Sequence, residues 1–317
     1  MVFIVEPNES VAALALRLER EQVIRSAWLF RKYLVWKGID KEIQAGQFTV
    51  TAPITLARVV AVLQARATQE ERTITIIPGW DLRDLLEYLE KEGLTQADEL
   101  FALVGEPARL YDPPQAAVGK DRLAPVFPSD AKVLADHPLT VSYEGYLAPE
   151  TYRIFSDATL KGIIEKLIGE RDQEFTESMS ADIEKAKRSV HEVLTVASLV
   201  EREVRGKVDR AKVADIFWRR YDAGWALQAD SSVHYVAGRK GDVFTTKKER
   251  DADSLWNTYK YPGLPPSPIC NPSIESIQAA IYPEKNDYWY FLTTFEGNVK
   301  YARTLDEHNA NVGRYLR

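Results

Sequence analysis

The stretch that most constrains this chain is an apolar segment at residues 193–204 that ends in two carboxylates. It reads Val-Leu-Thr-Val-Ala-Ser-Leu-Val-Glu-Arg-Glu-Val. At roughly 100° per residue, its aliphatic side chains form one broad arc of a helix, with Thr195 and Ser198 on the other side. Glu201 and Glu203 fall on the two flanks of the arc. The pattern predicts a core helix with an acid at each edge of its apolar face.

Two interpretations of these acids follow from the helix alone. A carboxyl beside apolar neighbours is harder to ionise, so its pKa rises and it can donate a proton near neutral pH. Alternatively, Glu201 and Glu203 pair with Arg202, Arg205 or Lys207 in surface ion pairs that contribute little stability. The periodicity leaves a catalytic acid and an ordinary ion pair both open.

Composition narrows the class of protein. A length of 317 residues suggests about two domains. The 45% hydrophobic and 28% charged fractions are those of a soluble globular chain. The net charge of −6, with no long cluster of Lys or Arg, argues against a nucleic-acid partner.

Cysteine and histidine usage argues against a metal site. Cys270 is the single cysteine and there are four histidines, which excludes an intrachain disulfide and a cysteine metal cluster. We expect no metal and no cofactor. No segment reaches the roughly 18 to 20 apolar residues that span a bilayer. The strand-like start after Met1 is compatible with an ectodomain cut from an upstream anchor.

The first fifty residues predict a small βααβ unit. A β-branched strand at 2–5 precedes a helix capped by Ser10, a second helix opened by Ser26, and a strand at 46–50. This is the arrangement of LysM-like glycan-binding modules. We expect a LysM-like subdomain at 1–70 and a mixed α+β domain at 71–317.

The larger domain is expected to be mixed α+β, with an irregular, proline-rich connection at 105–139 and with turns, aromatic residues and short strands beyond Gly224. A helix is predicted at 55–67, before this domain begins. Within the domain, the predicted elements are a strand at 73–77, a helix at 81–92, a long solvated helix over 160–190, a helix at 209–221 and a buried strand at 287–294.

Six collinear motifs give the chain a resemblance to a known family. The run Ala-Ser-Leu-Val-Glu-Arg-Glu at 197–203 resembles the ASIVEKE-like signature of the YceG/MltG family of endolytic murein transglycosylases. The other motifs are similar to that family's EGYLFPDTY at 144–152, LQSD at 227–230, NTY at 257–259, GLPPGPIxNP at 263–272 and EHN at 307–309.

The chain also departs from the family pattern. Pro78-Gly79 stands where Pro-Glu-Gly is usual, Trp256 replaces a tyrosine, and Val299 stands where a histidine is often found. Ser231-Ser232 follows the LQSD-like motif where Pro-Thr is common. These differences affect fine substrate contacts and leave the glutamate of the signature in place.

The resemblance implies an α+β fold and a lytic transglycosylase, a carbon–oxygen lyase, with Glu201 as its catalytic glutamate. The acid protonates the oxygen that links N-acetylmuramic acid to N-acetylglucosamine, and the carboxylate then takes the proton of the C6 hydroxyl. That hydroxyl attacks C1 and closes a 1,6-anhydro ring. Glu203 is implied to be a neighbour of lesser importance.

The resemblance also implies substrate-binding residues, each of which has a structural alternative. Gln228, Asp230 and Asn257 could hold the sugar or orient Glu201, but the first two could cap a turn and the third could bind loop backbone. The further substrate-binding candidates, which could equally be structural, are Tyr259 and Glu144.

The implied partner is the nascent peptidoglycan glycan strand. The family places such a protein at the outer face of the bacterial cytoplasmic membrane, near penicillin-binding proteins, with a single-pass anchor expected upstream. Two alternatives stay open. One is a two-carboxylate glycoside hydrolase with Glu201 as acid and Asp230 as base or nucleophile. The other is a catalytically silent peptidoglycan-binding scaffold.

Overall fold

The computed structural model describes residues 1–6, 9–40, 43, 45–64, 71–113, 123–238 and 246–316. They form a mixed α+β structure of many helices and three two-stranded sheets within these ranges. The chain divides into two compact units. The first comprises Met1–Ile74 and Tyr152–Ala158, and the second comprises Thr75–Thr151 and Thr159–Arg317.

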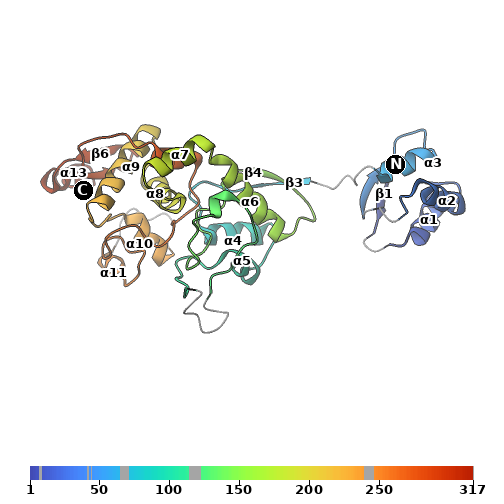
Figure 1. Ribbon diagram of the computed structural model, residues 1–317, viewed down its shortest axis with the longest axis horizontal. Helices are drawn as coiled ribbons and strands as arrows, with labels where there is room; N and C mark the ends of the chain where they lie inside the picture. Colours follow the sequence, from blue (N-terminus) through green and yellow to red (C-terminus); the bar gives the residue numbers. More distant parts are fainter. Residues whose placement is uncertain are drawn as a thin grey trace. The chain divides into compact units, whose positions relative to one another are not determined.

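The first unit contains the predicted strand-helix-helix-strand order, followed by a third helix (Figure 1). β1 and β2 pair antiparallel, with Val2 opposite Thr49. The side chains of Ser10 and Ser26 cap α1 and α2 as predicted. The elements are β1 (Val2–Val5), α1 (Val11–Arg20), α2 (Ala27–Lys37), β2 (Gly46–Thr49) and α3 (Leu56–Gln64). Residues 65–67 of the predicted third helix lie outside the described residues.

The second unit is helical, with a small antiparallel hairpin of β5 and β6 near its C-terminal helix. Its helices are α4 (Leu82–Lys91), α5 (Ala97–Val104), α6 (Leu160–Glu174), α7 (Glu177–Lys185), α8 (Val190–Glu203), α9 (Lys207–Asp222), α10 (Asp230–Ala237), α11 (Lys247–Arg250), α12 (Ile274–Ile281) and α13 (Leu305–Tyr315). The hairpin strands are β5 (Tyr290–Thr293) and β6 (Val299–Ala302). A further pair, β3 (Glu71–Thr75) with β4 (Thr151–Phe155), consists mostly of residues of the first unit.

Helix α8 is the core of the second unit. It packs against α7, α9, α10 and α12, and every residue from Val193 to Val200 is buried. The side opposite the predicted apolar arc is buried too, because Thr195 and Ser198 lie in the core. Their hydroxyls donate 2.8 Å hydrogen bonds to the carbonyls of His191 and Thr195, which satisfies them inside the core.

Several other elements differ from the prediction. The single long helix over 160–190 is instead two helices, because the chain leaves the helical conformation at Phe175 and Thr176 then caps α7. The buried strand at 287–294 is shorter and only half-buried as β5. α5 was not predicted, and neither were α10, α11, α12 and α13, which lie where turns and short strands were expected. The connection at 105–139 is irregular apart from one 3₁₀ turn at Lys132–Leu134, and its residues 114–122 lie outside the described ranges.

No helix among the described residues combines the length and the apolar composition needed to cross a bilayer.

Two glycines of the second unit provide a matched test of its packing. Gly145 has φ +88°, and a Cβ there would lie 2.5 Å from Cβ and Cγ of Pro268. Gly145→Ala should therefore destabilise the protein by about 2–4 kcal/mol, from overpacking and backbone strain. Gly169→Ala, inside α6, meets no atom within 4 Å and should stabilise by about 0.5–1 kcal/mol. Chemical denaturation of both variants measures this, and equal effects would contradict it.

Candidate functional site

The carboxylate of Glu201 lies at the end of α8 among polar groups. One oxygen accepts hydrogen bonds from the backbone N–H of Ser273, at 3.0 Å, and from its hydroxyl. The other accepts from Arg210 on α9 at 3.1 Å. The side chain is only 7% exposed. All three groups donate hydrogen bonds to the carboxylate of Glu201. The immediate surroundings of this side chain are therefore more polar than the apolar flank predicted from the sequence.

A Pro-Gly turn lies directly beside Glu201. A Cβ on Gly79, whose φ is +85°, would sit 3.8 Å from Cγ of Glu201. The carbonyl of Gly79 accepts two hydrogen bonds from Arg202, at 2.8 and 3.1 Å, and its N–H donates to the carbonyl of Asn271. Arg202 therefore holds the Pro-Gly turn against the end of α8.

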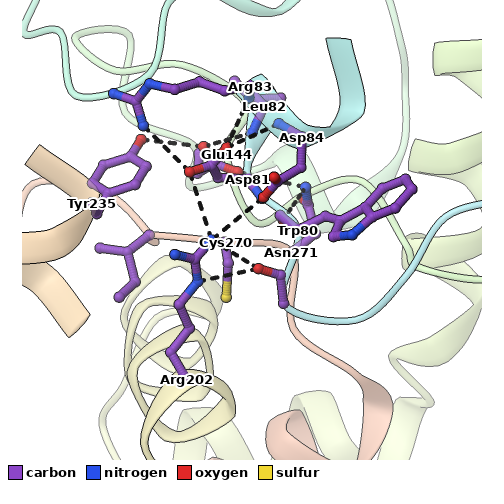
Figure 2. A network of polar contacts seen from close by, with 12 residues as sticks. Trp80, Asp81, Leu82, Arg83, Asp84, Glu144, Arg202, Tyr235, Cys270 and Asn271 are labelled. Atoms are coloured by element: carbon purple, nitrogen blue, oxygen red, sulfur yellow. Dashed lines mark hydrogen bonds and ion pairs between the residues drawn. The ribbon is translucent and has the colours of Figure 1, made fainter. Parts of the chain in front are cut away.

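Arg202 points into a cluster of carboxylates at the start of α4 (Figure 2). Its guanidinium lies 3.6 Å from Asp81 and 3.7 Å from Asp84. Asp81 also caps α4, because it accepts hydrogen bonds from the N–H groups of Arg83 and Asp84. One guanidinium therefore joins α8 to α4 and to the turn at Gly79.

Glu144 belongs to the same cluster and is completely buried. One of its oxygens accepts hydrogen bonds from the N–H of Leu82, at 3.1 Å, and from the hydroxyl of Tyr235, at 3.2 Å (Figure 2). Burial raises the pKa of Glu144 well above its usual value, and the nearby Asp81 carboxylate raises it further. Its side chain is enclosed by protein in this conformation.

Asn271 holds this region together. Its side-chain oxygen accepts from the N–H groups of Gly145, at 3.0 Å, and Leu147, at 3.1 Å. Its side-chain nitrogen donates to the carbonyl of Trp80 at 3.2 Å and approaches Glu144 at 3.5 Å. Two motifs far apart in sequence, at 144–152 and 263–272, are joined through this one amide.

Glu203 points to a different set of residues from Glu201. Its carboxylate accepts two hydrogen bonds from Ser231 in the first turn of α10. The backbone N–H of Ser231 donates one at 3.2 Å, and the hydroxyl of Ser231 donates the other at 2.6 Å. Burial raises the pKa of Glu203 to about 7, the Asp230 carboxylate adds to the rise, and the bonds from Ser231 oppose it.

Asp230 and Tyr259 meet beside Glu203. The hydroxyl of Tyr259 donates to Asp230 at 2.9 Å. Burial raises the pKa of Tyr259 far above its usual value, and the charges of Asp230 and Glu203 contribute. The loops that carry the two residues are tied together, since Gln228 N–H donates to the carbonyl of Thr258 at 3.1 Å.

Gln228 and Asn257 have contrasting settings. Gln228 has an exposed side chain and a left-handed φ of +53°, a conformation that costs energy in a non-glycine residue. Asn257 is buried, and its amide donates 2.8 Å hydrogen bonds to the carbonyls of Arg250 and Ala252 while accepting from the N–H of Tyr259. These hydrogen bonds stabilise the loop that carries Asn257.

The structure therefore sorts the predicted residues into three places around the end of α8. Gln228, Asp230 and Tyr259 gather near Glu203, Glu201 lies by the Pro-Gly turn, and Glu144 lies in the buried cluster. The sequence interpretation missed the partners Arg210, Ser231 and Ser273. Ser273 directly follows the predicted motif at 263–272, so position in the chain was the only available signal for it.

A cavity of about 300 Å³ opens beside Ser273. It is lined by apolar groups such as Ile76 and Pro149 and by the carboxylates of Glu150, Glu174 and Glu275. Among the described residues, no group of three or more His, Cys, Asp or Glu side chains is arranged to hold a metal ion.

Comparison with known proteins accounts for this set of motifs. Residues 3–314 match the YceG-like family. The chain belongs to the YceG-like family. A Bacillus subtilis (strain 168) protein named endolytic murein transglycosylase is 34% identical over 313 residues, which cover 98% of this chain and 83% of that protein.

Two further family members extend the comparison. A Streptococcus pneumoniae (strain D39) protein with the same name is 27% identical, and the match covers 98% of this chain but 57% of that longer protein. The crystal structure of a putative yceG-like protein from Listeria monocytogenes superposes with a TM-score of 0.60 at 29% identity, covering 98% of both chains. The α+β fold of this chain is therefore that of the YceG-like family.

The raised pKa of Glu203 predicts a specific pH dependence of stability. The unfolded chain releases this proton near 4.5, whereas the folded protein keeps it until about 7. Folding stability attributable to Glu203 is therefore present below 4.5 and is lost as the pH rises towards 7. A glutamine at this position has no proton to release, so Glu203→Gln should not lose this stability. Its free energy of unfolding should rise relative to that of the parent by up to about 3 kcal/mol across that pH interval.

Urea unfolding of both proteins over this pH range measures the difference. Glu184→Gln, at an exposed position of α7, is the matched control and should follow the parent at every pH. Parallel curves for the Glu203 variant and the parent would contradict the prediction.

Proposed function

We propose that this protein is an endolytic peptidoglycan lytic transglycosylase, which cuts the bond between N-acetylmuramic acid and N-acetylglucosamine and leaves 1,6-anhydro ends. The observation that carries the proposal is the match over 98% of the chain to a relative named endolytic murein transglycosylase, in a protein that retains Glu201 at the end of the buried helix. A rigid helix suits this task, because an acid must be held close to one glycosidic oxygen.

Glu201 acts first as the acid and then as the base. In its acid form it protonates the glycosidic oxygen. The resulting carboxylate takes the proton of the C6 hydroxyl, which attacks C1, so no water is consumed. Arg210 and both donors of Ser273 stabilise the carboxylate that exists between the two proton transfers. Their positions beside Glu201 support this cycle.

The residues near Glu203 hold the sugar. Asp230, bonded to Tyr259, presents a carboxylate and an aromatic ring, a combination suited to hydroxyls and to the apolar face of a pyranose. The exposed Gln228 adds an amide, and its strained backbone is typical of functional positions. Glu144 and Asn257 position these segments from within, as their enclosed hydrogen bonds indicate.

The remaining assignments concern substrate and location. We propose that the first unit is LysM-like and that the substrate is the nascent glycan strand. The protein then works at the outer face of the cytoplasmic membrane beside glycan-polymerising penicillin-binding proteins. The order of β1, α1, α2 and β2 in the first unit supports the first of these assignments.

Product analysis tests the reaction and the residue together. Incubation with uncrosslinked glycan strands, followed by mass spectrometry, should give anhydromuramyl-ended fragments. Glu201→Gln should lower the rate by roughly 10²–10⁴-fold, because the proton transfers lose their donor and acceptor. Glu184→Gln is the control for an unrelated glutamate and should retain full activity.

Three outcomes would overturn parts of the proposal. Fragments with reducing ends would identify a hydrolase. Full activity in Glu201→Gln, with loss in Glu203→Gln, would transfer the acid role to the carboxyl with the raised pKa. Intact strands with the parent protein, despite measurable binding, would leave a glycan-binding scaffold.

A further inference from the structure

Helix α2 of the first unit is apolar on two opposite faces. Ala27, Phe30 and Leu34 are buried in the core of the unit. On the outer side, Trp28 is 69% exposed and Trp36 is 73% exposed. The other large apolar residues of this outer face are Leu29 and Val35, which are 51% and 60% exposed. A helix that only packed against its own core would carry polar residues there.

The charged side chains of α2 itself are all positive, and one carboxylate, Glu19 of α1, lies at the start of the helix, where it accepts a hydrogen bond from the N–H of Ala27. Residues 22–39 contain four cations and no Asp or Glu, in a chain whose net charge is −6. Arg31 and Lys32 are exposed between the two tryptophans, and Lys37 lies 5.2 Å from the centre of the Trp36 ring. The fourth cation is Arg25. None of the four forms an ion pair within the described part of the chain.

We propose that this outer face of α2 binds the interfacial region of an anionic lipid bilayer. Tryptophan rings favour the boundary between headgroups and acyl chains, Leu29 and Val35 supply aliphatic surface, and the four cations attract anionic headgroups. The helix lies in the plane of the surface and keeps Phe30 and Leu34 in its own core.

A glycan fits this face less well. Sugar-binding sites combine an aromatic platform with carboxylates or amides that bond the hydroxyls. Between Gln22 and Asp40 the sequence has no Asp, Glu, Asn or Gln, and two aliphatic residues occupy the surface instead. Aliphatic groups together with cations match a lipid interface.

Vesicle co-sedimentation of the full 317-residue chain tests the proposal. The protein should bind phosphatidylcholine vesicles that contain phosphatidylglycerol more strongly than pure phosphatidylcholine vesicles, and added salt should reduce the difference. Trp36→Ser and the double variant Arg31→Glu/Lys32→Glu should each weaken binding roughly tenfold or more.

Two matched controls separate a specific surface from general stickiness. Phe295→Ser removes an exposed aromatic group of the second unit, and Lys247→Glu/Lys248→Glu reverses two adjacent exposed cations on α11. Both should bind vesicles like the parent. All altered positions are exposed, so thermal unfolding should be unchanged in every variant, which removes misfolding as a cause of lost binding.

Other results would overturn the proposal. The parent could ignore both kinds of vesicle, or the α2 variants could bind as well as the controls. Loss of binding to purified peptidoglycan in Trp36→Ser, without any vesicle binding by the parent, would identify a glycan platform instead. Self-association abolished by Trp36→Ser, again without vesicle binding, would identify an interface between copies of this chain.

Discussion

The pairing of every charged side chain in the last turn of α8 is the interaction on which the second unit depends. The helix is buried on all sides from Val193 to Val200, yet it ends in Glu-Arg-Glu. Charges this close to a core are tolerated only when each has a partner. Arg210 and Ser273 satisfy Glu201, Asp81 and Asp84 satisfy Arg202, and Ser231 satisfies Glu203, as described above.

These pairs also distribute the site in space. Neighbours on a helix diverge by about 100°, so three successive side chains point in three directions. Glu201 meets the Pro-Gly turn at Gly79 and Arg202 meets the cluster at Asp81, while Glu203 meets the first turn of α10. Segments separated by more than a hundred residues are brought to a single helical turn because each supplies the partner of one charge.

The sequence predicted the parts of this arrangement that depend on local pattern. The apolar run predicted α8, and the serines at 10 and 26 predicted the starts of their helices. Motif order supplied the proposal that Glu201 is the acid. Side-chain surroundings depend on distant partners, which periodicity cannot supply. The burial of Glu144 depends on Asn271 and Tyr235, and the polar setting of Glu201 depends on Ser273. For the same reason the helical periodicity, which set Thr195 opposite the apolar arc, did not reveal that this residue is buried.

The two acids at the end of α8 have different surroundings. Glu201 accepts hydrogen bonds from Arg210 and Ser273, whereas burial raises the pKa of Glu203 to about 7. In the proposed cycle one acid, Glu201, passes through both protonation states in succession.

The first unit shows a different relation between folding and surface chemistry. α2 is held by its own signals, since Ser26 caps its start and Gly38, with φ +72°, ends it in the left-handed conformation. Phe30 and Leu34 supply its packing. Trp28 and Trp36 therefore contribute nothing that the helix requires to form, and two large apolar side chains kept in water need another explanation. Contact with a surface outside the chain supplies one, because burial there removes them from water without altering the fold.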